Sequence, residues 1–371
     1  MNQQTIGSSI GGLFGRGGFR KRSLIGIEAG VASARVAARQ QRGRSETWLL
    51  SALDLDSSPI LARGDPPTRA AAPGAKSVVH GSAICALNSD AVNVFPLSLR
   101  PTESQPLEQL MVNQARDHLG EKLEDLVIDY SVVPEAVRRP GNDDVTVLVF
   151  AVSNTVVNEL LHKLQQVRLE VDRLLTPACV LAPWVARADD QERHLLFATA
   201  EEATSVAIVQ HGHVLLERLV PWGIGRLVER MRQELALSDG QCRLLLDPPW
   251  LSPAGSEGES DFESQTDSPV ISTADTLRRI LEPDFQELAR QAAGCLGYCD
   301  SYYRPAEIVA ATVVGPMAEF SPLQEVLKTS LGIPARGPEE GLTLPAVVDQ
   351  NDTASYTTAA CCALWPERQT T

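Results

Sequence analysis

Apolar and polar residues alternate with a period of two near the start of the chain. The alternation runs through "LIGIEAG", "SARVAARQ" and "WLLSALDLD", with turns at Gly30 and Gly43. Successive side chains of a strand point to opposite faces, so this period is typical of strands. We therefore expect three antiparallel strands between Leu24 and Asp56.

A second group of alternating segments lies in the middle of the chain, in "HLLFATAEEATSVAIVQHGHVLLERLVP". It predicts three more antiparallel strands between His194 and Pro221. Each group opens one half of the chain and precedes helical material. The repeated order predicts a duplicated α/β lobe.

The remaining pattern predicts further elements of both kinds. Strands are expected in "SVVHGSAICALN", "AVNVFPLSL", "LEDLVIDYSVVP", "VTVLVFAVS" and "EIVAATVVGPM". Apolar residues three and four positions apart predict helices. Those helices lie in "PLEQLMVNQARDHLG", "NTVVNELLHKLQQVR", "GIGRLVERMRQEL", "LRRILEPDFQELARQAAGCLGYCDSYY" and "TASYTTAACCALW".

Three segments lack such a pattern. Residues 1–22 are Gly-rich and end in "GRGGFRKR", residues 57–77 are rich in Pro, Ala and Gly, and residues 247–273 are acidic and rich in Ser, Pro and Gly. Segments of this composition bury too little apolar surface to fold alone. We expect a flexible basic tail, a linker and a disordered acidic loop. A weak contact of the tail with anionic lipid or an acidic partner stays open.

The 371 residues carry a formal charge of −14. A chain of this length is too long for one compact core, in agreement with two lobes. The negative charge argues against a general nucleic-acid binder, whose affinity depends on Lys and Arg that neutralise phosphates. No apolar run approaches the roughly 20 residues that cross a bilayer, and no signal peptide is evident. We expect a soluble, cytoplasmic chain that other proteins recruit to the membrane.

The seven cysteines are scattered, and none has the spacing of zinc ligands. Cys295 and Cys299, for example, are four positions apart in a helical pattern. We expect buried, reduced thiols and no metal site. His211 and His213 lie two positions apart, but no carboxylate or third ligand stands at metal spacing, so solvated imidazoles in a turn are expected.

The order of these elements resembles the actin-like ATPase fold and, within it, the PilM-like type IV pilus assembly proteins, which are related to the cell-division protein FtsA. The first hairpin, "LIGIEAGVASARVAA", is similar to the first phosphate motif of the family, and "TVVGPMAEFSPLQEVL" is similar to its adenosine motif. "FPLSLRP", with the helix and strand after it and the pair Asp129–Tyr130, looks like the small extra subdomain of PilM. The resemblance runs from about Leu24 to Trp365.

The resemblance implies an α/β chain with the actin-like ATPase fold. The chain would have two lobes, each with a central mixed sheet. The first lobe would also contain a small α/β extra subdomain. The first lobe would span residues 23–190, with the extra subdomain at about 91–172. The second lobe would span 191–345, and a C-terminal segment at 346–371 would hold the closing helix.

In the first hairpin, the resemblance places Glu28 where Asp is usual, keeps Gly30, offers the Ser33 hydroxyl and puts Arg35 in place of Lys. Glu is one methylene longer than Asp, and a misplacement of that size can lower a rate by about 10²-fold. Arg keeps the charge of Lys but not its compact geometry. The first hairpin therefore lacks two of the side chains that the family uses to bind the nucleotide.

The second hairpin has lost more of the family pattern. Ala198 stands at the position of the acid and Ala200 at that of the glycine, whereas Thr204 is retained. The period-two geometry of the hairpin predicts that Glu201 and Glu202 are solvated turn residues and do not replace the missing acid.

The late glycine turn has also changed, because Gly315 is followed by Pro316 and Met317. Proline lacks a backbone donor, and both side chains are expected to fill the space of the adenosine. Gly223 and Gly225 are retained, but a Gly-x-Gly pair alone is a weak signal, since turns that enter helices often contain it.

Together these changes predict a pseudo-ATPase with no catalytic and no metal-binding residue. Its vestigial nucleotide cleft is expected to hold Glu28, Gly30, Ser33, Arg35, Thr204, Gly223, Gly225 and Gly315. We expect no cofactor, and weak binding of ATP with Mg²⁺ stays the alternative.

The resemblance then implies a non-catalytic cytoplasmic scaffold of a bacterial type IV pilus, or of a related secretion system, at the inner membrane. Its expected partner is the cytoplasmic tail of a PilN-like membrane protein. A cytoplasmic motor ATPase and self-association are further expectations. The alternatives are an ATP-binding actin-like assembly protein with nucleotide-regulated polymerisation, a GspL-like type II secretion component, and a sugar-kinase-like enzyme, which Ala198 and Ala200 disfavour.

Overall fold

The structure is a computed structural model of the 371-residue chain. It describes residues 24–30, 32–42, 45–55, 82–120, 125–138, 144–185, 192–246, 273–342 and 353–368. The predicted basic tail, the linker at 57–77 and the turn at Gly43 lie outside these ranges. So does the predicted acidic loop, except for Thr273, where a helix begins.

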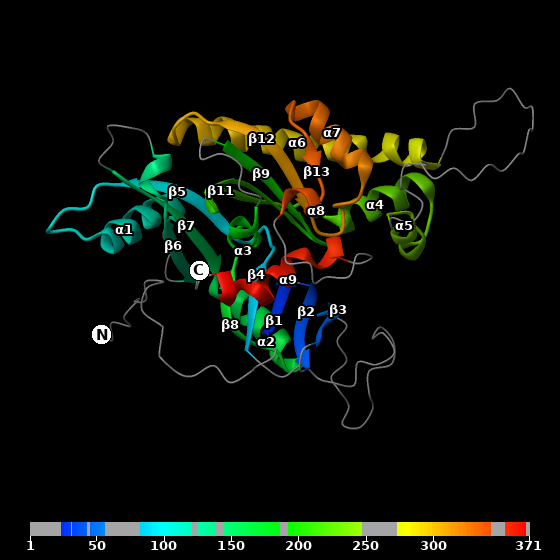
Figure 1. The fold of residues 1–371 in the computed structure, drawn as a ribbon, viewed down its shortest axis with the longest axis horizontal. Helices are drawn as coiled ribbons and strands as arrows, with labels where there is room; N and C mark the ends of the chain where they lie inside the picture. The colour runs from blue at the N-terminus through cyan, green and yellow to red at the C-terminus, as the bar shows by residue number, and fades with distance from the viewer. Residues whose placement is uncertain are drawn as a thin grey trace, which may run out of the picture.

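The first lobe is built on a five-stranded mixed sheet in the order β3-β2-β1-β4-β8. Its strands are β1 (Leu24–Ala29), β2 (Ser33–Arg42), β3 (Ser45–Asp54), β4 (Ser82–Leu87) and β8 (Glu170–Leu175). The first three are antiparallel neighbours, as predicted, and β4 runs parallel to β1 (Figure 1). The alternation of apolar residues places Ile25, Ile27 and Ala29 in the core of this lobe.

The second lobe repeats this arrangement in the order β11-β10-β9-β12-β13. Its strands are β9 (Glu192–Thr199), β10 (Thr204–Gln210), β11 (His213–Val220), β12 (Glu307–Val314) and β13 (Ala335–Arg336). Again three consecutive strands are antiparallel, and a later strand, β12, lies parallel to the first of them. The predicted repeat of an α/β lobe is therefore present.

A separate three-stranded antiparallel sheet forms the extra subdomain, in the order β5-β7-β6. Its strands are β5 (Asn93–Leu99), β6 (Leu126–Val132) and β7 (Val145–Ser153). One face packs against α1 (Leu107–Leu119) through Phe95, Met111 and Val149. The strand β6 forms one edge of the sheet within the described residues.

The subdomain ends earlier than the predicted boundary at residue 172. The helix α2 (Asn154–Gln166), which follows β7, buries Leu160 and Leu164 in the core of the first lobe. After it, β8 pairs in parallel with β4. A helix whose apolar stripe faces the first-lobe sheet belongs to that lobe. The boundary is not visible in the sequence, because α2 follows the last subdomain strand directly.

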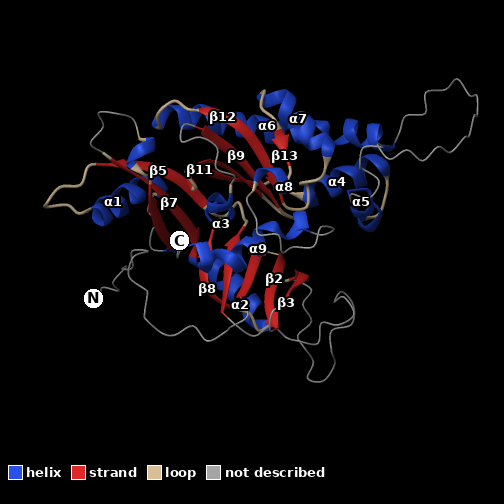
Figure 2. Cartoon of the chain, viewed as in Figure 1, coloured by secondary structure: helices blue, strands red, loops and turns tan. Residues whose placement is uncertain are grey.

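Helices cover the outer face of the second lobe (Figure 2). They are α4 (Ile224–Leu235), α5 (Asp239–Leu246), α6 (Thr273–Tyr302) and α7 (Ser321–Leu331). The short helix α8 (Pro338–Gly341) packs instead against Thr312 of β12, on the opposite face of the sheet. Phe285 of α6 lies between Trp222 and Phe320, with ring centroids 6.2 and 5.6 Å away. This aromatic contact joins α6 to the segments that lead into α4 and α7. The helices α5 and α7 were not predicted from the sequence.

The last helix, α9 (Thr353–Arg368), returns from the second lobe to cover the sheet of the first (Figure 1). Residues 357–364 of it are buried against β1, β2 and β4. The approach is close at Gly26, where a Cβ atom would lie 1.8 Å from the carbonyl oxygen of Ala359 and 2.3 Å from the backbone nitrogen of Ala363. Only glycine fits on β1 at this point, because both neighbours are backbone atoms.

We predict that Gly26→Ala destabilises the protein by roughly 3 kcal/mol or more, because the added methyl group forces α9 away from β1. Urea unfolding measures the loss, and hydrogen exchange of the α9 amides locates it. Gly294→Ala is the matched control, since a Cβ at Gly294 of α6 meets nothing within 4 Å. That variant should be neutral or more stable by about 0.5–1 kcal/mol. Equal unfolding of Gly26→Ala and the wild type would contradict the close packing.

Candidate functional site

The turns of the two hairpins meet between the lobes. The backbone N–H of Ala32, after β1, donates to Oε1 of Glu202, after β9, at 2.7 Å. Beside this contact, Nδ2 of Asn88 donates to the carbonyl oxygen of Ala198 at 3.1 Å and to Oε1 of Glu28 at 3.4 Å. The structure thus brings together the two hairpins that the sequence assigned to one nucleotide cleft, and joins them directly.

The first-hairpin acid, Glu28, points inward and is only 2% exposed. Its partners are Asn88 and the guanidinium of Arg35, which lies opposite it on β2 with Nη1 3.9 Å from Oε2. Burial raises the pKa of the Glu28 carboxyl, and the nearby charge of Arg35 opposes that rise. Hydrogen bonding from the side chains of Asn88 and Thr358 also opposes the rise of this pKa. The Glu28 carboxylate is thus enclosed by protein groups and lies beside a cation of the same hairpin.

The backbone donors of the first turn already have acceptors. The N–H of Gly30 donates to the carbonyl oxygen of Ser33 at 2.8 Å, and that of Ala32 donates to Glu202. A Cβ atom at Gly30 would lie 2.9 Å from Oε2 of Glu202, so the glycine leaves room for this carboxylate. A phosphate group that approached this turn would meet a carboxylate already in place.

In the second hairpin, Ala198 and Ala200 are buried. The retained Thr204 is buried too, and its hydroxyl donates to the carbonyl oxygen of Trp222 at 2.7 Å. This hydrogen bond ties β10 to the turn before α4. The role of Thr204 in the described structure is therefore to hold the hairpin.

The prediction of two solvated glutamates in the second turn is wrong. Glu201 forms a bidentate ion pair with Arg243 of α5, at 3.1 and 2.5 Å, and Glu202 reaches the first hairpin. Both side chains are half-buried. Their partners come from other elements, so the period of the hairpin did not reveal them.

Gly223 and Gly225 pack the start of α4 against the second turn. The N–H of Ile224 donates to the carbonyl oxygen of Ala200 at 3.1 Å, and that of Gly225 donates to the carbonyl oxygen of Glu201 at 3.0 Å. A Cβ atom at Gly223 would lie 2.4 Å from that same oxygen of Glu201. The first amides of α4 therefore bind the hairpin backbone, and the glycines permit the close approach.

Gly315, which follows β12, has a φ of +89°, and a Cβ atom there would lie 2.0 Å from the carbonyl oxygen of Thr199. Met317, which was expected to fill the adenosine space, lies next to this turn. Its side chain is buried in the core of the second lobe, and its N–H donates to Oγ1 of Thr199 at 3.2 Å. Thr199 thus fixes the late turn on the second hairpin.

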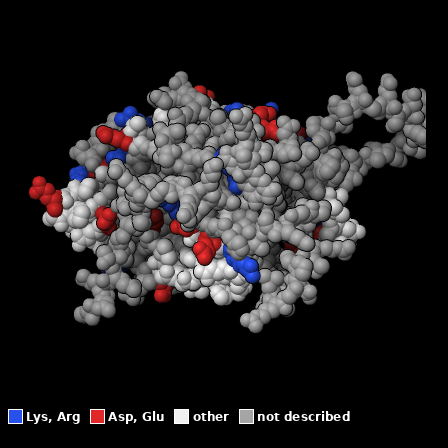
Figure 3. Space-filling view, turned by 60° about the horizontal axis from the view of Figure 1, so that its bottom comes forward, with Lys and Arg blue, Asp and Glu red and all other residues white. Residues whose placement is uncertain are grey.

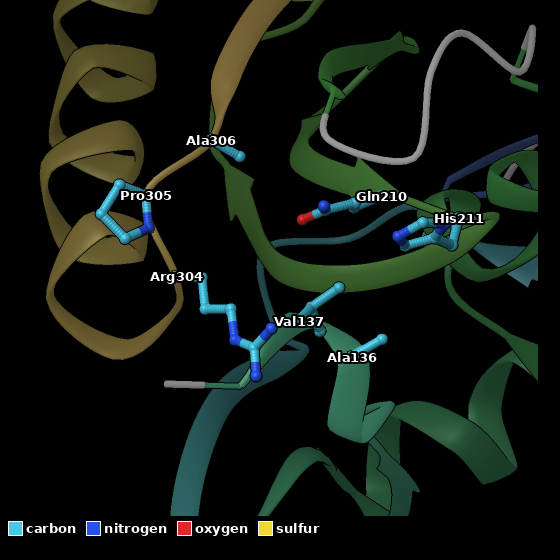
Figure 4. Close-up of a pocket in the computed structure, with 7 residues that line it drawn as sticks. All are labelled: Ala136, Val137, Gln210, His211, Arg304, Pro305 and Ala306. Carbon is cyan, nitrogen blue, oxygen red and sulfur yellow. The ribbon is translucent and has the colours of Figure 1, made fainter. Parts of the chain in front are cut away.

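A cavity of about 200 Å³ lies away from these turns, at the seam between the subdomain and the second lobe (Figure 4). It is lined by Ala136, Val137, Gln210, His211, Arg304, Pro305 and Ala306. Nε of Arg304 donates to the carbonyl oxygen of Arg138 at 2.6 Å, and the buried Arg193 donates to the carbonyl oxygen of Arg304. The hydrogen bond from Arg304 to Arg138 crosses the seam, whereas Arg193 lies on β9 and also pairs with Asp300 of α6 at 3.3 Å.

The described ranges contain no group of three His, Cys, Asp or Glu side chains that could hold a metal ion. Six of the seven cysteines are buried, and Cys179 is half-buried, so the expected burial of the thiols is confirmed for most of them. None of the helices in these ranges has the length and apolar character needed to cross a membrane. Figure 3 shows acidic and basic side chains interspersed over one face of the molecule.

We predict that Glu28→Gln removes part of the pH dependence of stability. The raised pKa means that the folded state holds a proton that the unfolded state releases above about pH 4.5. Wild-type stability therefore falls as the pH rises from 4.5 through the raised pKa. Glutamine does not ionise, so its stability relative to the wild type should increase between pH 5 and pH 8 in urea unfolding. Glu103→Gln, at an exposed position, is the control, and identical profiles for all three proteins would refute the prediction.

No family model and no curated protein matches the sequence. Among solved structures, the chain is similar to the "PilM-PilN type IV pilus biogenesis complex", with 15% identity, a TM-score of 0.64, and coverage of 92% of this chain and 97% of that chain. It is also similar to the ethanolamine utilization protein EutJ from Carboxydothermus hydrogenoformans, with 11% identity, a TM-score of 0.45, and coverage of 93% and 90%. A third similar structure is the cytoplasmic domain of EpsL, an inner membrane component of the type II secretion system of Vibrio cholerae. It has 13% identity and a TM-score of 0.35, and the match covers 63% of this chain and 79% of that chain.

The similarity to the PilM–PilN structure extends over nearly the whole of both chains, and at this identity it shows the fold. The other two TM-scores lie below 0.5. The predicted resemblance to PilM is confirmed at the level of the fold. The chain has the α/β actin-like ATPase fold, with two repeated lobes and a three-stranded extra subdomain.

Proposed function

We propose that the chain is a non-catalytic scaffold of a type IV pilus or related secretion platform, and that it binds the cytoplasmic tail of a PilN-like membrane protein. The observation that carries the proposal is the similarity to the PilM–PilN structure over 92% of the chain. In this function the scaffold is cytoplasmic, and its partner recruits it to the inner membrane. A motor ATPase that contacts the scaffold, and self-association, belong to the same proposal.

The state of the cleft supports a scaffold without ATP turnover. The acid position of the second hairpin is Ala198, and the first-hairpin acid, Glu28, is buried against Asn88 and Arg35. Glu202 and Ser33 accept the hydrogen bonds of the first turn. Phosphoryl transfer depends on carboxylates that hold a metal ion and on donors that face the phosphates. Both requirements are poorly met by this set of residues.

The edge of the extra subdomain supports a peptide partner. The strand β6 pairs with β7 on one side, and no described strand pairs with it on the other. Val127 and Val132 of β6 are 42% and 44% exposed, although they are large apolar residues. An extended peptide can add a strand to such an edge, with affinity from main-chain hydrogen bonds and selectivity from side-chain contacts. The predicted Asp129–Tyr130 pair lies on the same strand.

The alternatives differ in what they require. An actin-like assembly protein controlled by nucleotide needs a cleft that binds ATP with Mg²⁺, and a sugar-kinase-like enzyme needs an acid that replaces Ala198. A GspL-like component would be the cytoplasmic domain of a type II secretion protein and would not require the tail of a PilN-like protein. Measurements of ATP binding and of peptide binding distinguish these functions.

We expect calorimetry to detect no binding of ATP with Mg²⁺ at micromolar protein concentration. The physical reason is that a polyphosphate must displace Glu202 and has no carboxylate pair to hold its metal ion. A variant with Ala198→Asp and Ala200→Gly, which restores the family residues, is the comparison. Micromolar binding by the native chain would overturn the proposed absence of turnover and favour nucleotide-regulated assembly.

We expect a labelled peptide of the cytoplasmic tail of the PilN-like protein from the same organism to bind the chain. In fluorescence anisotropy, Val127→Lys with Val132→Lys should weaken this binding by roughly tenfold or more, since charged side chains replace apolar contacts at the edge. Leu244→Lys is the control, because Leu244 on α5 is 67% exposed and lies on another element. It should change the affinity by less than about twofold. Equal effects of the two variants would contradict docking at β6.

A further inference from the structure

The cavity at the seam is enclosed by two separate parts of the molecule (Figure 4). The extra subdomain supplies Ala136 and Val137, from the short helix η2 (Glu135–Val137) after β6, and the second lobe supplies the other lining residues. The apolar wall consists of these two residues with Pro305 and Ala306. The volume of about 200 Å³ exceeds that of a cavity of roughly 150 Å³ that accommodates benzene. A ligand of about six to ten non-hydrogen atoms therefore fits.

Arg304 brings a guanidinium to this cavity. Its Nε donates to the carbonyl oxygen of Arg138 at 2.6 Å, and its backbone N–H donates to the carbonyl oxygen of Val137 at 3.2 Å. Both bonds cross the seam and fix the position of the residue. Neither Nη atom of Arg304 has a hydrogen-bond or ion-pair partner among the described residues. The planar group therefore keeps N–H donors for a ligand, in the geometry that matches a carboxylate.

A second cation lies behind the wall of the cavity. Arg193 is fully buried, and its guanidinium binds two lining residues: Nε donates to Oε1 of Gln210 at 3.0 Å, and Nη2 donates to the carbonyl oxygen of Arg304. The carboxylate that pairs with Arg193, at 3.3 Å, is that of Asp300, whose side chain is 65% exposed. One paired carboxylate thus accompanies two guanidinium groups. An anion in the cavity meets more positive than negative charge.

We propose that the seam cavity binds a small organic carboxylate. Its oxygens pair with the guanidinium of Arg304, and its short hydrocarbon part contacts the apolar wall. Glu135 and Glu307, which adjoin lining residues in the sequence, are exposed, so water screens their repulsion of such a ligand. Free short-chain acids and the carboxyl terminus of a peptide share this chemistry. The inference goes beyond the proposed scaffold function and depends neither on the PilN-like tail nor on the nucleotide cleft.

Saturation-transfer difference NMR on the full chain tests the proposal with sodium butanoate, which has six non-hydrogen atoms. We expect a dissociation constant of about 1–10 mM, as is usual for a ligand of this size. Butanamide has the same size but no charge, and it should bind at least about tenfold more weakly. Each titration is made at constant ionic strength with sodium chloride. Equal binding of the two compounds, or no binding of butanoate, would overturn the proposal.

Two variants locate the site. Arg304→Gln should weaken butanoate binding by roughly tenfold or more, whereas the same change at the exposed Arg116 of α1 should alter it by less than about twofold. Ala136→Phe fills the cavity from an exposed position and leaves Arg304 in place, so it should abolish binding. An unchanged dissociation constant for Ala136→Phe would overturn the proposal even if Arg304→Gln does not fold.

A four-residue peptide that ends in valine distinguishes the two sources of the carboxylate. Tighter binding of the peptide acid than of butanoate would identify a chain terminus as the ligand. Saturable binding of butanoate without binding of the peptide would identify a free small acid. Both outcomes support a carboxylate site, whereas equal binding of the peptide acid and its carboxyl-terminal amide would contradict it.

Discussion

A backbone N–H that is shielded from water must find an acceptor, and this constraint governs how the two lobes are joined. In a nucleotide-binding cleft, phosphate oxygens serve as acceptors for the hairpin turns. Here the chain supplies its own acceptors: Ser33 for Gly30, Glu202 for Ala32, and the carbonyl oxygens of Ala200 and Glu201 for the first amides of α4. Each acceptor fixes one segment against another. The contact between the two hairpins is thus held by hydrogen bonds whose donors and acceptors all come from the chain itself.

The same principle joins the other parts of the molecule. Glu217 of β11 is fully buried, and it accepts hydrogen bonds from the Ser205 hydroxyl at 2.6 Å, from the N–H of Ala178 at 3.2 Å and from the Thr176 hydroxyl. It ties α3 (Pro177–Leu181), which follows the last strand of the first lobe, to the sheet of the second. At the subdomain seam, Arg193 and Arg304 bind backbone oxygens in turn. Charged groups at the junctions thus bind mainly to backbone atoms and neutral side chains, which fixes the relative position of the parts.

The sequence predicts most of the strands and helices but few of the contacts between them. Period-two alternation identified both groups of antiparallel strands, because each strand of a sheet carries its own pattern. The subdomain boundary was placed too late, since the apolar stripe of α2 does not say which sheet it faces. The role of Glu202 was missed because its partner, Ala32, lies 170 positions away. The burial of Met317 in the second-lobe core was missed for a similar reason, because the turn after Gly315 decides where its side chain goes.

The closing helix has a consequence for the order in which the protein folds. α9 covers β1 and β2, yet it is made from residues 353–368, which follow the whole second lobe in the sequence. The strands of the first lobe therefore gain their contact with α9 only after the second lobe has been synthesised. Domains usually fold in the order of their synthesis. In this chain the last strand of the first-lobe sheet ends at Leu175, yet the helix that covers that sheet is synthesised only after the second lobe.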